Sequence, residues 1–353
     1  MLGILLVLVA ALPSTSADST RPLEHGFRVV REHFRPAQPI PLAAGSQFTL
    51  PRFENRAREA LVSWNLDLEP GAAARIEARV GRWDDALQAT PWLFVGYAGA
   101  VPATKGLQQG GFAQIDVDVL RSEVPLGWIE VRVSNTGRAP LRIERVDITL
   151  RDRQRRSALA APPALTHTAP ALPHTAPALP RAMPALQVPA RSQRHDTGAL
   201  GSRLCSPTSV SMVLAYHGIE LPTLTVAASS HDALHDLYGN WPRNVQAAFE
   251  HGLEGYLTAI AHWSEAEALL ARGIPLVISI AAGEGELRGA PYARTGGHLL
   301  VLRGVDACGD LLAMDPASST QPERTYRRSD LTRCWLARGG TCYVLLGPRR
   351  PLR

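Results

Sequence analysis

The sequence predicts an α+β fold class in two parts, an all-β sandwich domain followed by a mixed domain of helices and strands. Three observations lead to this prediction. Short runs of alternating apolar and polar residues fill residues 45–152, alanine and proline dominate residues 153–187, and a helical pattern precedes several strands in residues 188–350. With 353 residues and 45% hydrophobic content, the chain can fill two cores.

The N-terminus has the pattern of a signal peptide over residues 1–17. An apolar stretch at residues 2–12 is followed by small residues up to Ala17, where a signal peptidase would cut. The stretch is too short to cross a bilayer, and no later segment reaches the roughly 18–20 apolar residues that a membrane helix needs. We therefore expect a secreted, periplasmic or cell-envelope protein without a membrane span, in which residues 18–44 form an N-terminal extension.

The predicted sandwich of residues 45–152 shows its clearest alternation at Ile115, Val117 and Val119. Aspartates lie between these apolar residues, which indicates one buried and one solvated face and explains the acidic residues without a metal. No catalytic cluster is evident in this half. Exposed tryptophans could stack on sugars, so contact with a glycan or the cell envelope is one role considered for it. The candidate tryptophans are Trp64, Trp83 and Trp92.

Residues 153–187 read as an Ala/Pro-rich linker. The sequence HTAPALP occurs twice in succession, at residues 167–173 and 174–180, and prolines at this density prevent a helix. A semi-extended spacer of this kind marks a domain boundary. Brief proteolysis is expected to cut within it.

The formal charge of +5 comes almost entirely from arginine, and Lys105 is the only lysine. The arginines are scattered along the chain rather than concentrated in basic blocks. Nucleic-acid binding is therefore not expected, and no pattern calls for a metal or another cofactor.

The second half places Cys205 directly ahead of an apolar helical segment that ends at Gly218. Pro207 suits the first turn of that helix. The free backbone N–H groups and the dipole at a helix N-terminus favour a thiolate, which lowers the thiol pKa. A nucleophile is one interpretation of Cys205, and a small buried core residue is the other.

A thiolate needs a base, and His298 is the best placed histidine. It follows Gly296 and Gly297, which leave room for a substrate backbone, and it opens an apolar strand. A turn at residues 307–310 then returns the chain, so that Asp315 comes close to His298 and can orient the imidazole. For the oxyanion, the backbone N–H of Cys205 and the side-chain amide of Gln193 are the expected donors.

These residues, in the order Gln193, Cys205, His298 and Asp315, resemble those of a papain-type cysteine peptidase. The local sequence resembles the family related to the peptidases that remove double-glycine leaders from bacteriocins, cysteine peptidase family thirty-nine. The matching stretches are SQ before LCSPTSVSMVL, YGNWPRNVQAAFEHGL, ARGIPLVISI, TGGHLLVLRG, MDPAS and LTRCW…CYVLL. The resemblance implies a papain-like fold over residues 188–350, a peptide or protein substrate, and a Cys-His-Asp triad acting through a thioester.

Two alternatives stay open at this point. The same triad supports acyl transfer to an amine, and a degenerate papain-like domain would leave a non-catalytic surface or glycan-binding protein. Trp241 is a candidate for the substrate cleft together with the two glycines before His298. Among the other cysteines, Cys334 and Cys342 are the expected disulfide, because the chain between them turns back through a Gly-Gly pair. No transporter segment accompanies the domain, so leader removal coupled to export is not expected.

Overall fold

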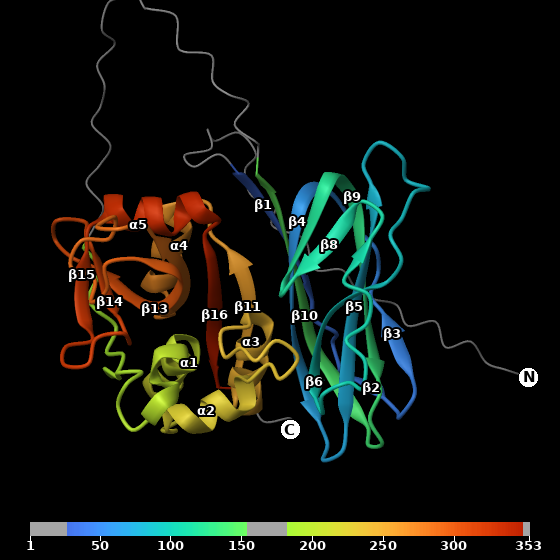
Figure 1. Ribbon diagram of the computed structural model, residues 1–353, viewed down its shortest axis with the longest axis horizontal. Coiled ribbons are helices and arrows are strands. Elements are labelled where there is room, and N and C mark those ends of the chain that lie inside the picture. Colours follow the sequence, from blue (N-terminus) through green and yellow to red (C-terminus); the bar gives the residue numbers. More distant parts are fainter. Residues whose placement is uncertain (1–26, 154–181, 349–353) are drawn as a thin grey trace, which may run out of the picture.

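The computed structural model describes residues 27–153 and 182–348, which form two domains lying side by side (Figure 1). The predicted signal peptide and most of the predicted linker, residues 154–181, lie outside the described residues. None of the helices within the described ranges is long and apolar enough to cross a membrane.

The first domain is a single ten-stranded antiparallel sheet whose main path runs β1-β10-β4-β9-β5-β6. Its strands are β1 (Phe27–Phe34), β2 (Ile40–Leu42), β3 (Gln47–Thr49), β4 (Phe53–Leu68), β5 (Ala73–Arg82), β6 (Leu93–Gly99), β7 (Gln109–Gly110), β8 (Ala113–Asp116), β9 (Val119–Asn135) and β10 (Leu141–Arg153).

This sheet curls around one core instead of separating into two sheets. Strand β4 pairs with β9 through residues 53–61 and with β10 through residues 59–68, so one long strand connects the two parts of the sheet. The all-β prediction therefore holds for this domain, but the division into a two-sheet sandwich is not confirmed. Of the tryptophans considered for sugars, Trp64 is fully buried in the core and Trp83 is 58% exposed.

Strands β1 and β2 lie within residues 18–44, which the sequence analysis assigned to an extension. Both strands pair with β10 and belong to the sheet, so that part of the prediction was wrong. The charged residues of β1 hide its alternation, because some of them face the second domain rather than solvent. Arg31, for example, donates to Thr258 Oγ1 at 2.8 Å and forms an ion pair with Glu265.

The second domain contains a six-stranded antiparallel sheet in the order β11-β16-β12-β13-β14-β15. Its elements are η1 (Gly198–Arg203), α1 (Cys205–Tyr216), α2 (Thr223–Ser230), α3 (Trp241–Glu250), β11 (Leu253–Ala259), α4 (Trp263–Ala271), β12 (Leu276–Ala282), β13 (Thr295–Val305), β14 (Leu311–Met314), β15 (Glu323–Tyr326), α5 (Arg328–Cys334), η2 (Leu336–Arg338) and β16 (Thr341–Pro348).

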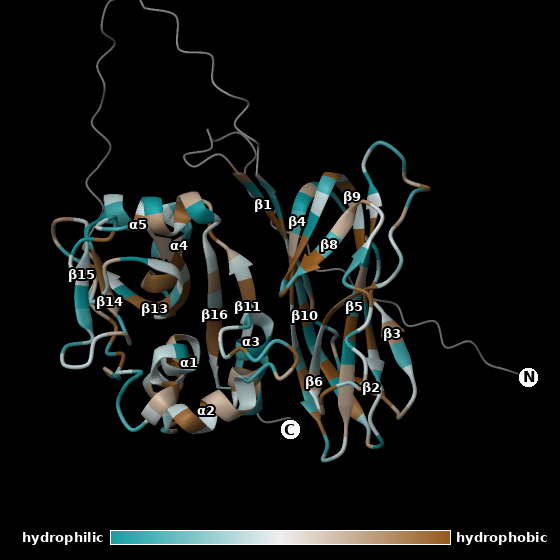
Figure 2. Cartoon of the chain, viewed as in Figure 1, coloured by the Kyte–Doolittle hydropathy of each residue, from teal (hydrophilic) through white to brown (hydrophobic). Residues whose placement is uncertain are grey.

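Both faces of this sheet are buried, which explains why its strands read as continuous apolar runs. Val277 and Val301 point into the core beneath α1 and α3. Their neighbours Leu276 and Leu302 point into the core on the opposite face, together with residues of α4 and α5. Figure 2 shows hydrophobic residues along these strands and hydrophilic residues on the outer helix α5.

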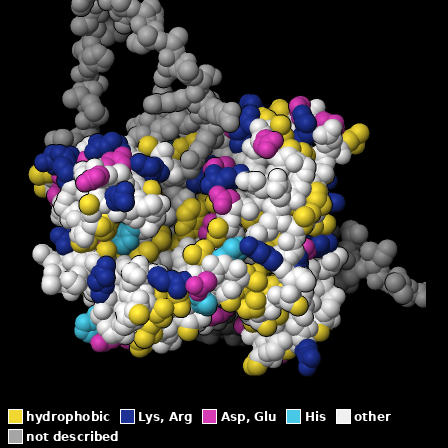
Figure 3. Space-filling model, viewed as in Figure 1, with side chains coloured by type: hydrophobic (Ala, Val, Ile, Leu, Met, Phe, Trp, Pro, Cys, Tyr) yellow, Lys and Arg dark blue, Asp and Glu magenta, His cyan; other side chains and the backbone are white. Residues whose placement is uncertain are grey.

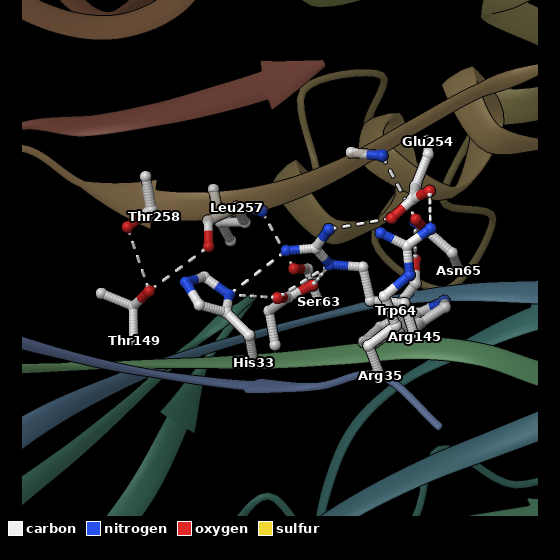
Figure 4. A network of polar contacts seen from close by, with 12 residues as sticks. His33, Arg35, Ser63, Trp64, Asn65, Arg145, Thr149, Glu254, Leu257 and Thr258 are labelled. Carbon is white, nitrogen blue, oxygen red and sulfur yellow. Dashed lines mark hydrogen bonds and ion pairs between the residues drawn. The ribbon is translucent and has the colours of Figure 1, made fainter. Parts of the chain in front are cut away.

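The first domain covers the edge strand β11 of the second sheet (Figure 4). Backbone N–H groups of β11 donate to side chains of β4: Leu257 to Ser63 Oγ at 2.9 Å and Gly255 to Asn65 Oδ1 at 3.2 Å. An uncovered edge would leave these groups unpaired. Polar residues on β4 therefore complete the hydrogen bonding of a strand from the other domain.

A buried ion-pair network lies beside this edge (Figure 4). Arg145 contacts Asp147 through Nε at 2.7 Å and Glu254 of β11 through Nη1 at 2.9 Å. His33 Nδ1 lies 2.6 Å from the same Asp147 carboxylate. Of these three contacts, the one between Arg145 and Glu254 joins the two domains, and Asp147 holds the Arg145 guanidinium in place for it.

Charged side chains on the face shown in Figure 3 are mixed in sign rather than gathered into one patch. Many arginines are paired with acidic residues, as Arg79 is with Glu130 at 2.6 Å and Arg328 with Glu267 at 2.7 Å. The basic composition therefore does not produce a single cationic surface on this face.

Candidate active site

Cys205 is the first residue of α1 and is separated from the η1 turn by Leu204 alone. Burial alone would raise the pKa of its thiol. The hydrogen bond and charge of His298, together with the backbone N–H groups of Leu299 and Ser206, act in the opposite direction and lower the pKa of Cys205 below its ordinary value. The other residues of α1 up to Ala215 are buried, so the helix is fixed against the sheet and holds the thiol in place.

His298 lies on β13, opposite Ile280 of β12, and is almost fully buried. Its Nε2 atom is 2.8 Å from Asp315 Oδ1, which leaves Nδ1 for the thiol of Cys205. Burial lowers the pKa of this imidazole, but the Asp315 carboxylate and the Cys205 thiolate outweigh burial and raise the pKa of His298 to about 10.

Asp315 follows β14, which pairs antiparallel with β13 so that Met314 lies opposite Val301. The hairpin brings the carboxylate back to His298, as the sequence argument required. Its Oδ1 atom also accepts the backbone N–H of Ala317 at 2.9 Å. Despite complete burial, the pKa of Asp315 is lowered, because His298 and other donors compensate for the lost hydration.

Two tyrosines for which sequence reasoning expected no contact with the triad donate to the other oxygen of Asp315. Tyr326 donates to Oδ2 at 2.7 Å and Tyr292 donates to the same atom at 3.1 Å. The only sequence signal for Tyr292 is its position shortly before the Gly-Gly-His motif. Tyr326 lies on β15, and only the sheet order brings it beside β14.

Gln193 lies between the Asp315 loop and the turn that precedes Cys205. Its backbone N–H donates to Pro316 O at 2.8 Å, and its side-chain Nε2 donates to Gly201 O at 2.7 Å. One amide hydrogen is thus engaged, and the second is the one that an oxyanion would use. The role of oxyanion donor stays a prediction.

The residues expected in the substrate cleft have different surroundings. Gly296 and Gly297 are exposed, and a Cβ atom added at either position would meet no atom within 4 Å, so the space before His298 is open. Trp241 begins α3 and is partly buried against the same core as Cys205. Its backbone N–H donates to Asp118 Oδ2, from the first domain, at 2.8 Å.

The expected Cys334–Cys342 disulfide is absent from the structure, where all four cysteines are free thiols. Cys334 ends α5, and Cys342 lies within β16 opposite Ile278. The chain between them forms the η2 turn rather than a tight hairpin, and each thiol packs into the apolar core as a small hydrophobic side chain. Cys308 is exposed.

Comparison with known proteins supports the resemblance found in the motifs. Residues 185–343 match the model of the family described as "Peptidase_C39 like family". The second domain is therefore similar to cysteine peptidase family C39, the bacteriocin leader peptidase-like family, as its motifs predicted. No curated protein matches the chain.

Three solved structures resemble this half of the chain. A double glycine motif protease from an AMS/PCAT transporter, in complex with the leader peptide, is 22% identical, with 47% of this chain and 94% of that chain covered and a TM-score of 0.33. A putative C39-like peptidase from Bacillus anthracis is 17% identical over 48% and 100%, with a TM-score of 0.37. The peptidase domain of Streptococcus ComA is 16% identical over 42% and 93%, with a TM-score of 0.31.

Proposed function

We propose that the protein is a cysteine peptidase-like hydrolase that cleaves a peptide or amide bond with the triad Cys205, His298 and Asp315. The contact of the Cys205 thiol with His298, whose far nitrogen bonds Asp315 at 2.8 Å, carries the proposal. Because the thiol pKa is lowered and the imidazole pKa is raised to about 10, the thiolate–imidazolium pair stays ionised between the two values. The family of the second domain supports a peptide substrate.

In the proposed reaction, the Cys205 thiolate attacks the substrate carbonyl carbon. The negative charge that develops on the carbonyl oxygen is stabilised by the backbone N–H of Cys205 and the free amide hydrogen of Gln193. The His298 imidazolium then protonates the leaving amine, and a thioester forms on Cys205. The neutral imidazole next takes a proton from water, which attacks the thioester and releases the acid.

The residues of the predicted signal peptide support a place outside the cytoplasm, in the cell envelope or secreted. Gly296 and Gly297 are proposed to border the bound substrate backbone, and Trp241 to form part of the cleft wall. The open space before His298 supports the first of these placements, and the partial exposure of Trp241 supports the second.

Alkylation by iodoacetamide at pH 6 tests the proposal without knowledge of the substrate. An ordinary thiol with a pKa near 8.5 is almost wholly protonated at this pH and reacts slowly. Cys205 should react rapidly, and His298→Ala should slow it strongly because the counter-charge of the thiolate is lost. Peptide mapping by mass spectrometry identifies the labelled cysteine, with exposed Cys308 as the internal reference. If Cys205 labels no faster than Cys308, the proposed function fails.

Gln193→Ala separates the oxyanion role from the activation of the thiol. Alkylation forms no oxyanion, so its rate should hardly change. Cleavage of a fluorogenic peptide library should fall by about 10²–10³-fold, the usual effect of removing an oxyanion donor. A variant that loses alkylation and cleavage in parallel would instead assign Gln193 to folding, through its hydrogen bonds to Pro316 and Gly201.

A further inference from the structure

The Asp315 carboxylate is saturated with donors. Oδ1 accepts from His298 Nε2 and from the Ala317 backbone, and Oδ2 accepts from the hydroxyls of Tyr292 and Tyr326. Burial and the neighbouring carboxylate raise the pKa of both tyrosines, so each hydroxyl keeps its proton and donates. A carboxylate held on both oxygens has no freedom to rotate away from the imidazole.

Tyr292 differs from Tyr326 in that it also contacts the histidine. The rings of Tyr292 and His298 meet edge to face, with centroids 4.9 Å apart and an interplanar angle of 64°. Tyr326 lies fully buried behind the carboxylate, whereas Tyr292 is partly exposed beside the open Gly-Gly segment. Tyr292 therefore contacts both the group that orients the base and the base itself.

Tyr292 belongs to residues 283–294, the segment between β12 and β13. An ion pair holds this segment against α5. Arg288 donates to the buried Asp330 carboxylate through Nε at 2.9 Å and Nη2 at 2.8 Å. Hydrogen bonds from Arg288 and Arg333 outweigh burial and lower the pKa of Asp330 to about 2, so this ion pair persists over the working pH range. Glu286 of the same segment pairs with Arg338 at 2.9 Å.

We infer that Tyr292 is a positioning residue of the proposed reaction: its hydroxyl fixes the Asp315 carboxylate while its ring fixes the plane of the His298 imidazole. The inference rests on the proposed function. Tyr292 acts through these two residues and takes no part in bond making. Without the Tyr292 hydroxyl, Asp315 loses one of the donors that compensate for burial. The carboxylate is then less firmly oriented toward the His298 imidazolium, whose positive charge it stabilises.

The experiment measures the pH dependence of Cys205 alkylation in the full chain. In Tyr292→Phe, the ring stays and only the hydroxyl is lost. The thiolate–imidazolium pair then becomes less favourable, so alkylation at pH 6 should slow by about 3- to 10-fold, the size of one hydrogen bond. The midpoint of the profile should move up by about half to one pH unit, with the maximal rate at high pH unchanged. Tyr326→Phe should move the midpoint in the same direction.

Tyr216→Phe is the matched control, because its hydroxyl donates to Gly273 O at 3.0 Å and touches no member of the triad. Its profile should coincide with that of the parent protein. A purely structural role for Tyr292 would lower the thermal unfolding temperature without moving the midpoint, and that result overturns the inference.

Addition of Asp315→Ala to Tyr292→Phe completes a double-mutant cycle. If Tyr292 acts through Asp315, its loss should have little further effect once the carboxylate is gone, and an undiminished shift overturns the inference. The proposed function is judged separately, on the parent protein. It fails if Cys205 is unreactive at pH 6 before any tyrosine is changed.

Discussion

Asp315 in the candidate active site and Asp118 at the domain interface are both buried carboxyl groups, yet their pKa values shift in opposite directions. The pKa of Asp315 is lowered, whereas burial raises the pKa of Asp118 to about 7. Asp315 accepts from an imidazole and two tyrosine hydroxyls as well as from backbone N–H. For Asp118 the hydrogen bonds that oppose burial come from the backbone, chiefly the N–H of Trp241.

The position of Asp118 explains the missing donors. It lies in the tight turn between β8 and β9, where Val117 has a φ of 56° and the neighbouring Val119 packs into the core of the second domain. Figure 2 shows this hydrophobic end of the hairpin pointing toward the second domain. The turn therefore packs against the second domain through apolar side chains, and the Asp118 carboxylate loses its hydration as a consequence.

The cysteines show the same contrast. The pKa of Cys205 is lowered because His298 and backbone N–H groups stabilise the thiolate. Burial without such donors raises the pKa of Cys334 to about 11 and that of Cys342 further. Burial by itself thus raises the pKa of an acid, and hydrogen-bond donors or positive charges beside the group reverse the shift, as they do for Asp315, Cys205 and Asp330.

Exchange of each aspartate for asparagine should give the largest difference between the two regions, and the difference is in the rate of peptide cleavage. Asp315→Asn removes the charge that stabilises the imidazolium and permits the wrong tautomer of His298, so peptide cleavage should fall by about 10²-fold or more. Asp118→Asn leaves the triad unchanged, and its rate of peptide cleavage should stay within about twofold of the parent rate. The measurement is the initial rate on the fluorogenic peptide library. Equal losses in the two variants would show that the contrast has no bearing on catalysis.

The pH dependence of the free energy of unfolding should reveal the raised pKa of Asp118. Its pKa rises from an ordinary 3.8 to about 7 on folding, so between these values the folded state holds a proton that the unfolded state has lost. The stability that protonated Asp118 contributes to the folded state is fully present below pH 4 and is lost as the pH rises through 7. Asp118→Asn keeps an oxygen for the Trp241 N–H and should be more stable than the parent at pH 8 by roughly 2–4 kcal/mol.

Denaturant unfolding at pH 4, 6 and 8 measures this difference, which should shrink toward pH 4. Asp85→Asn is the control, because Asp85 is a partly exposed carboxylate of the same domain, whereas the charge of Asp116 itself raises the pKa of Asp118. A constant difference between Asp118→Asn and the parent at all three pH values would contradict the assignment of a raised pKa to Asp118.

The smallest effect concerns the thiols. In the native protein a thiol reagent should modify Cys205 and the exposed Cys308, and it should reach Cys334 and Cys342 only after unfolding. Four thiols should be counted under denaturing, non-reducing conditions. A count of two would restore the Cys334–Cys342 disulfide and refute the free, packed state of these cysteines.

The sequence alone determined the order and local setting of the proposed active-site residues. A cysteine ahead of an apolar helix, a histidine after two glycines and an aspartate beyond a hairpin turn are local patterns, and the structure places these three residues together. Strand periodicity likewise predicted the all-β first half. These features depend on neighbours only a few residues away or on a single turn, so they can be read without the fold.

Only the tertiary structure decided which distant residues complete the site and join the domains. Tyr292 and Tyr326 reach Asp315 because the sheet order sets their strands and loops around it, and Asp118 reaches Trp241 across a sequence separation of 123 residues. The pairing of Ser63 with the edge of β11, the curl of the first sheet and the burial of Cys334 and Cys342 have the same origin. Each depends on packing between segments that are far apart in the sequence. The local pattern of one segment does not show which other segment packs against it, so no local pattern could predict these features.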